Sequence, residues 1–189
     1  MKRWMCALLT AVLLIIGAVA VAEDDYSDKA VRPEVDNAVA MINAEFDPSG
    51  EYSLFDQNQE TEMGIGFASS TTSLTMIAMP TEDWQQAAAY VIMASDVDDY
   101  GLAMQAAYAL SGFYDFDDNS KYEMEGWLDG NWDDVMDCGA NDKQMSWGPL
   151  ETAALKVEMS VTPLPDYTRL NIILYITDDY SIDIYMGEN

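Results

Sequence analysis

The chain has 189 residues, of which 34 are Asp or Glu, 8 are Lys or Arg and none is His. Half of the residues are hydrophobic, which suffices for one domain with a buried core and is too much for a disordered chain. The formal net charge of −26 excludes nucleic-acid partners, because proteins that bind nucleic acids neutralise phosphates with clustered Lys and Arg. The lack of His excludes Ser-His-Asp catalysis and metal sites with His ligands.

The first 22 residues have the pattern of a secretion signal. Lys2 and Arg3 precede a low-polarity run over residues 4–22, which closes on Ala20-Val21-Ala22 and is followed at once by acidic residues. Small residues at this spacing are typical of a cleavage site, so we expect cleavage after Ala22. An uncleaved membrane anchor is the alternative, since the run is long enough to span a bilayer. We therefore expect a secreted protein, extracellular or periplasmic, with no membrane contact once residues 1–22 are removed.

The rest of the chain is predicted to be one domain. Residues 23–32 form an acidic leader, and no repeat or low-complexity linker divides residues 33–189. Cys138 is the single cysteine left after cleavage, so an intramolecular disulfide is excluded. We expect a small buried thiol at this position, with an intermolecular bridge as the alternative.

Helical and extended patterns alternate through the first part of this domain. Apolar residues recur at helical spacing from residue 35 to 46, with Pro33 in the first turn and a stop at 47–50. Residues 51–55 resemble a short strand. Two extended runs, 62–68 and 73–79, flank a polar turn and predict a hairpin. Gly64 and Gly66 weaken its first arm or mark a close backbone approach.

Two further helices are predicted before the acidic middle of the chain. One begins at Pro80-Thr81-Glu82-Asp83, where Thr81 can cap it, and places Trp84, Ala87, Ala88 and Val91 on one face. The other runs over 99–111, with Leu102, Ala106 and Leu110 inward and Gly112 ending it.

The clearest hairpin lies near the end of the chain. Apolar residues alternate with polar ones over 155–162, Pro163 to Tyr167 turn the chain, and alternation resumes over 170–176. The whole pattern predicts a single α+β domain, in which an antiparallel sheet built from two or three hairpins carries two or three helices on one face.

Residues 115–137 hold nine acidic residues and are the candidate site region. Asp115, Asp117 and Asn119 place oxygen ligands at alternate positions, as a calcium loop requires. Ser120 stands where that loop needs Gly, and Gly126 stands where it needs Glu. The pattern is therefore half complete, and it fits either a weak extracellular calcium site or a solvated acidic loop. No cofactor is required, and calcium is the one candidate.

The segment around Trp127 and Trp132 has two interpretations. A helix would turn both indoles mainly toward the core. A hairpin with its turn at Asp129-Gly130 would instead place the two indoles side by side, flanked by Glu125 and Asp134. Such a pair, rimmed by carboxylates, could bind a sugar ring or a cationic group.

These observations favour a secreted, strongly acidic, non-catalytic binding module, because no coherent catalytic set is present. A protein, a saccharide or a cationic molecule could be its partner. One alternative is a small secreted hydrolase that uses carboxylates, one of them with a raised pKa in a cleft. The other is a calcium-dependent extracellular module built on Asp115, Asp117 and Asn119.

Overall fold

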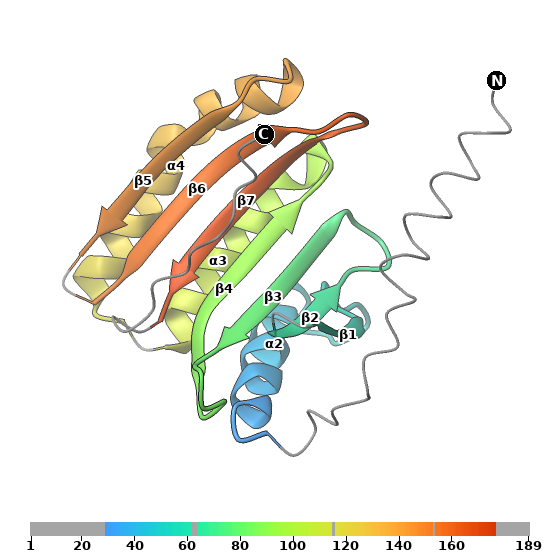
Figure 1. Ribbon diagram of the computed structural model, residues 1–189, viewed down its shortest axis with the longest axis vertical. Coiled ribbons are helices and arrows are strands. Elements are labelled where there is room, and N and C mark those ends of the chain that lie inside the picture. The colour runs from blue at the N-terminus through green and yellow to red at the C-terminus, as the bar shows by residue number, and fades with distance from the viewer. Residues whose placement is uncertain (1–28, 62–63, 115, 153, 177–189) are drawn as a thin grey trace, which may run out of the picture.

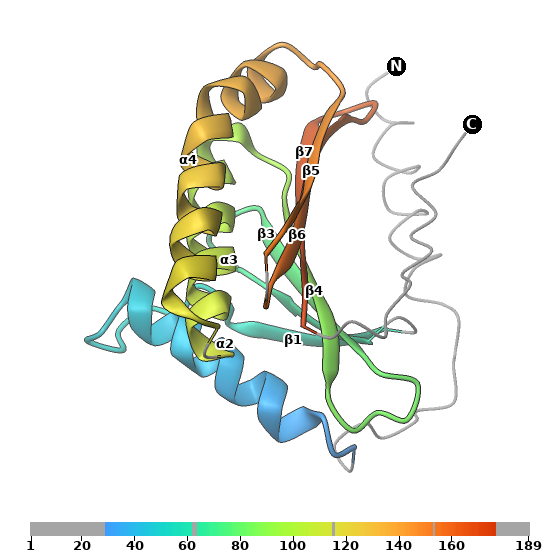
Figure 2. The same ribbon diagram turned by 90° about the vertical axis from the view of Figure 1, so that its left-hand side faces the viewer.

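The computed structural model describes residues 29–61, 64–114, 116–152 and 154–176. A seven-stranded antiparallel sheet carries three α-helices on one of its faces, as Figures 1 and 2 show. The α+β prediction is therefore confirmed. The expected secretion signal lies outside the described residues, and within them no helix is long and apolar enough to cross a membrane.

The sheet has the strand order β1-β2-β3-β4-β7-β6-β5, so the two hairpin-containing halves meet where β4 pairs with β7. The helices are α2 (Arg32–Phe46), α3 (Tyr100–Phe113) and α4 (Asp118–Ala140), and a 3₁₀ turn, η2 (Val97–Asp99), precedes α3. The strands are β1 (Gln57–Thr61), β2 (Gly64–Ala68), β3 (Leu74–Pro80), β4 (Ala87–Ala94), β5 (Met145–Glu151), β6 (Lys156–Pro163) and β7 (Thr168–Tyr175).

Helix α2 confirms the first predicted helix. Its inward face consists of buried apolar residues, and it ends where Asp47 adopts extended backbone.

The segment 51–55 is not the predicted strand. The side chain of Asn43 donates to the carbonyl of Phe55 and accepts from its N–H, at 3.0 and 2.9 Å. Because this side chain satisfies the backbone of Phe55, a core residue is held in place without a strand partner.

The helix predicted to begin at residue 80 is wrong. Thr81 to Gln86 form a turn, closed by a 3.0 Å hydrogen bond from the Thr81 N–H to the Gln86 carbonyl. Residues 87–94 form β4, which pairs with β3 on one side and β7 on the other. In this central strand Tyr90, Ile92 and Ala94 are fully buried in the core beneath the helices, and α3 packs on the strand. Tertiary packing has overridden the helical propensity of alanine.

Helix α4 settles the ambiguity over residues 122–137 in favour of a helix, and the hairpin interpretation is wrong. Asp117 caps the helix, because its carboxylate accepts bonds from the N–H groups of Asn119 and Ser120. Met124, Leu128, Val135 and Cys138 form its buried stripe over β6 and β7. Cys138 is a buried free thiol as expected, 3.8 Å from the sulfur of Met145.

The remaining predicted elements are confirmed, with small shifts. Helix α3 runs one residue beyond Gly112, and β6 and β7 form the C-terminal hairpin. Gly64 does mark a close backbone approach, because a Cβ there would clash with the carbonyl oxygen of Ala78. The edge strands β1 and β5 were not predicted. The sequence of β1 is polar throughout, and most side chains of β5 are exposed, so neither strand has the apolar–polar alternation that identifies a half-buried strand.

Candidate functional site

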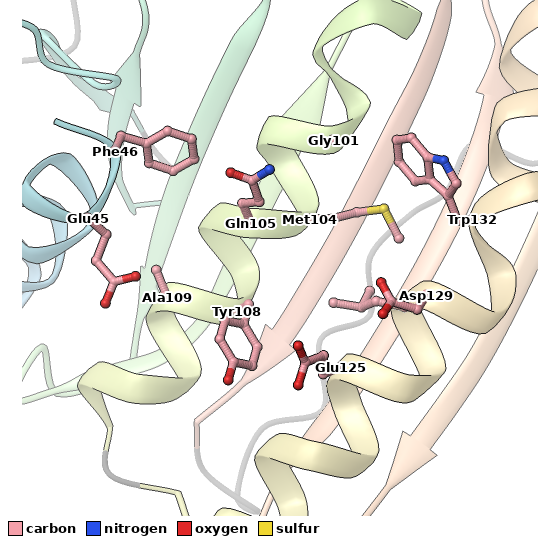
Figure 3. A pocket seen from close by; sticks show the side chains of 11 residues that line it. Glu45, Phe46, Gly101, Met104, Gln105, Tyr108, Ala109, Glu125, Asp129 and Trp132 are labelled. Carbon is pink, nitrogen blue, oxygen red and sulfur yellow. The ribbon is translucent and has the colours of Figure 1, made fainter.

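A groove of about 510 Å³ opens on the solvent side of the helix layer, where α2, α3 and α4 meet. This volume lies within the range typical of small-molecule sites. Figure 3 shows α3 running along the floor, with α2 on one side and α4 on the other. We call this site the groove; its lining consists of Glu45 and Phe46 from α2, Gly101, Met104, Gln105, Tyr108 and Ala109 from α3, and Glu125, Leu128, Asp129 and Trp132 from α4.

Local helix geometry places these side chains. Glu125 and Asp129 are four residues apart, so they lie one turn above the other on the same face of α4. Leu128 and Met104 are buried beneath these carboxylates, where α4 packs against α3. The indole of Trp132 lies over α3 beside Gly101, where an added Cβ would be 3.5 Å from the ring carbon Cη2, an ordinary van der Waals contact.

The groove is negatively charged and its charges are uncompensated. Three carboxylates, those of Glu45, Glu125 and Asp129, stand at its rim, and its described lining includes no Lys or Arg. Within the part of the chain that the structure describes, none of the three has a hydrogen bond or an ion pair. Tyr108, which is 41% exposed, and Gln105 add uncharged polar groups. The site can therefore attract a cation and contact an apolar body at the same time.

The structure brings two of the four predicted ligand-binding residues into this groove. Trp132 and Glu125 line it, whereas Trp127 and Asp134 do not. Five residues of α-helix turn the chain by about 140° beyond a full turn, so the two indoles point in different directions. Trp127 packs half-buried against the core, and Asp134 is exposed on the outer face of α4. The pair of adjacent indoles does not form.

The three predicted calcium ligands are placed only in part. Asp115 lies outside the described residues. The Asp117 carboxylate accepts hydrogen bonds from the Ser120 hydroxyl at 2.6 Å and from two backbone N–H groups, and these bonds lower its pKa. The Asn119 amide donates to Glu123 at 2.7 Å. Among the described residues, no three acidic or Cys side chains are grouped closely enough to hold a metal ion. Calcium binding stays a prediction.

Sequence reasoning missed Glu45, Phe46, Gln105, Tyr108 and Asp129 as site residues. They come from three helices that are far apart in the chain, so no local motif connects them. One signal was available: on a helix, Glu125 and Asp129 share a face with Leu128 and Trp132 close by. The hairpin interpretation placed Asp129 in a turn and hid this arrangement.

The other carboxyls with a displaced pKa serve the fold. Hydroxyl and backbone donors in turns lower the pKa of Asp47, Asp56 and Asp83, and each bonds a Ser or Thr nearby. Such groups stay ionised and hold loops in place. They do not have the raised pKa that a general acid requires at neutral pH.

A smaller hollow of about 320 Å³ lies on the opposite face of the sheet, over β5, β6 and β7. Its lining includes one carboxylate, Glu158, which Lys156 already neutralises at 3.4 Å. The ammonium group of Lys156 also lies 4.6 Å from the ring centre of Tyr175. The charges of this hollow are therefore compensated within the chain, in contrast to those of the groove.

Comparison with protein-family models, with curated proteins and with solved structures found no match to this chain.

Proposed function

We propose that this protein is a secreted, non-catalytic binding module, whose groove takes a ligand with a positively charged group and an apolar body. One observation carries the proposal: three unpaired carboxylates surround a largely apolar groove of about 510 Å³ whose described lining contains no cationic side chain. Carboxylates in such a place repel one another, and a cation relieves that repulsion.

The apolar part of the lining favours an organic cation over a bare ion. Met104 and Leu128 provide a buried aliphatic floor, and Trp132 and Tyr108 provide aromatic surfaces. Cations are attracted to the faces of indole and phenol rings as well as to carboxylates. The net charge of −26 supports fast capture of cationic molecules, with a strong dependence on ionic strength.

The test compares phenethylamine with its neutral analogue 2-phenylethanol, titrated into the purified protein and followed by calorimetry and tryptophan fluorescence. We expect saturable binding of the amine, up to about fivefold tighter than the alcohol, since an exposed ion pair contributes up to about 1 kcal/mol. The double variant Glu125→Gln/Asp129→Asn should lose this preference for the amine.

Asp133→Asn/Asp134→Asn is the matched control. Both residues are exposed on the same helix but outside the groove, so the control removes two charges without touching the site. Its affinity for phenethylamine should equal that of the unaltered protein. Equal binding of amine and alcohol, or equal weakening by the two double variants, would show that the groove does not select cations.

A further inference from the structure

We infer that the ligand of the groove is a linear aliphatic polyamine, in which a flexible hydrocarbon chain carries an ammonium group at each end. The inference rests on the proposed function and goes beyond it, because it assigns two cationic ends joined by an apolar spacer. The arrangement that supports it is a pair of acidic walls facing each other across an uncharged floor.

The carboxylates stand on two separate helices. Glu45 belongs to the last turn of α2, and Glu125 and Asp129 belong to the middle of α4. Both helices pack against α3. In Figure 3, Glu45 and Glu125 extend from opposite sides toward the space above α3. A ligand with one charge can pair with one wall, and it leaves the carboxylate of the other wall without a partner.

The surface between the two walls suits a chain of methylene groups. Ala109 and Met104 of α3 are buried there, and Leu128 lies at the foot of the α4 wall. Tyr108 stands between Glu45 and Glu125 in Figure 3 and offers a ring that an aliphatic chain can cover. An extended alkyl spacer would bury apolar surface along this floor while its ends reach the carboxylates.

Two other cationic ligands match the groove less well. A calcium ion needs six to eight oxygen ligands at about 2.3–2.6 Å, and the three carboxylates are distributed over two walls instead of around one point. A basic peptide would bring backbone amides into the groove. Each amide needs a hydrogen-bond partner, and Gln105 supplies the one side-chain amide of the described lining.

The experiment measures the affinities of 1,4-diaminobutane, spermidine and butylamine for the purified protein by calorimetry at constant ionic strength. Butylamine has the same carbon chain as the diamine and lacks its second charge. We expect the diamine to bind about fivefold tighter than butylamine, as one additional exposed ion pair allows, and spermidine to bind at least as tightly. Glu45→Gln should reduce the ratio of the two affinities to about two, which is the statistical factor for a diamine with two equivalent ends, and Asp134→Asn should leave the original ratio unchanged.

The outcomes separate this inference from the proposed function. If butylamine and phenethylamine bind but the diamine has no advantage, the groove binds cations and the polyamine inference is wrong. If no amine binds, both are wrong. If Asp134→Asn lowers the ratio as much as Glu45→Gln, the preference comes from the overall charge of the protein, and the inference is again overturned.

Discussion

The hydroxyl of Tyr114 donates a hydrogen bond of 2.7 Å to the carboxylate of Glu34, which joins the segment after α3 to the first turn of α2. The same hydroxyl lies 2.7 Å from that of Tyr90 on β4. A hydroxyl has one proton, so Tyr90 must donate to Tyr114. The other oxygen of Glu34 accepts from the N–H of Ala87 at 3.2 Å. One carboxylate therefore links α2, the segment after α3 and the start of β4.

The first prediction concerns this network. Tyr114→Phe should lower the free energy of unfolding by about 1–3 kcal/mol, because the partly buried Glu34 loses its hydroxyl donor. Tyr90→Phe should cost about 0.5–1.5 kcal/mol, since it removes a bond between neutral groups. Urea unfolding measures both. Tyr52, which is 76% exposed, is the control, and Tyr52→Phe should be neutral. A neutral Tyr114→Phe would mean that Glu34 does not depend on this hydroxyl.

The second prediction is a loss of stability at alkaline pH. Burial raises the pKa of Tyr100 from 10.0 to about 12, and burial also raises the pKa of Tyr90 and Tyr114. Between pH 10.0 and about pH 12 the unfolded chain releases the phenolic proton of Tyr100, whereas the folded chain keeps it. The free energy of unfolding therefore falls as the pH rises through this range. For Tyr100 the stabilisation is complete below pH 10 and declines through about pH 12, by about 2–3 kcal/mol.

Urea unfolding at several pH values between 8 and 12 checks this decline. At pH 8, Tyr100→Phe should lower stability, because the hydroxyl donates to the carbonyl of Thr168 at 3.0 Å. The same variant should have a shallower alkaline decline, since it lacks one of the titrating groups. An identical decline in both proteins would rule out a contribution from Tyr100.

The third prediction compares two glycines of α4. A Cβ at Gly139 would lie 2.6 Å from the Tyr100 ring carbon Cε2, so Gly139→Ala should destabilise the protein by about 1–3 kcal/mol through overpacking. Gly130 has open space around it, so Gly130→Ala should stabilise by about 0.5–1 kcal/mol through helix propensity. Thermal and urea unfolding show whether each substitution raises or lowers the free energy of unfolding. Stabilisation by both substitutions would contradict the packing of Tyr100 against α4.

The fourth prediction concerns divalent ions. The carboxylate of Asp117 is already used in capping α4, so calcium and magnesium at matched ionic strength should raise the melting temperature equally, by screening repulsion among acidic residues. A saturable rise specific to calcium would contradict this expectation and support the calcium hypothesis. In that case Asp117→Asn should abolish the rise while keeping the helix capped, since Asn is also a good N-cap.

Sequence reasoning succeeded where one element has one buried face. The apolar stripe of α2 and the alternation over the first half of β6 depend on local spacing, and both are present as predicted. It failed at Ala87 to Ala94, because alanine favours a helix in isolation and the deciding fact is the position of this segment between β3 and β7. It also failed at the edge strand β5, whose exposed residues carry no period.

In the groove, too, residue types could be recognised from the sequence, whereas the arrangement of the residues depends on the tertiary structure. Glu125 and Trp132 were candidate residues because of their residue types, and both line the groove, but the arrangement predicted for them requires a hairpin that the chain does not form. Its actual composition depends on contacts between helices that are distant in sequence. Glu45 precedes Glu125 by 80 residues, and no spacing rule connects residues so far apart.

The sequence alone determined the acidity, the exclusion of His-based chemistry, the α+β class and most of the periodic elements, since each of these depends on composition or on neighbours within a few turns. Only the tertiary structure decided that an alanine-rich segment is a central strand and that Glu45 faces Glu125 across α3. The physical reason is that the pairing of β4 with both β3 and β7 and the packing of α2 and α4 on α3 are properties of the assembled domain, which no single segment contains.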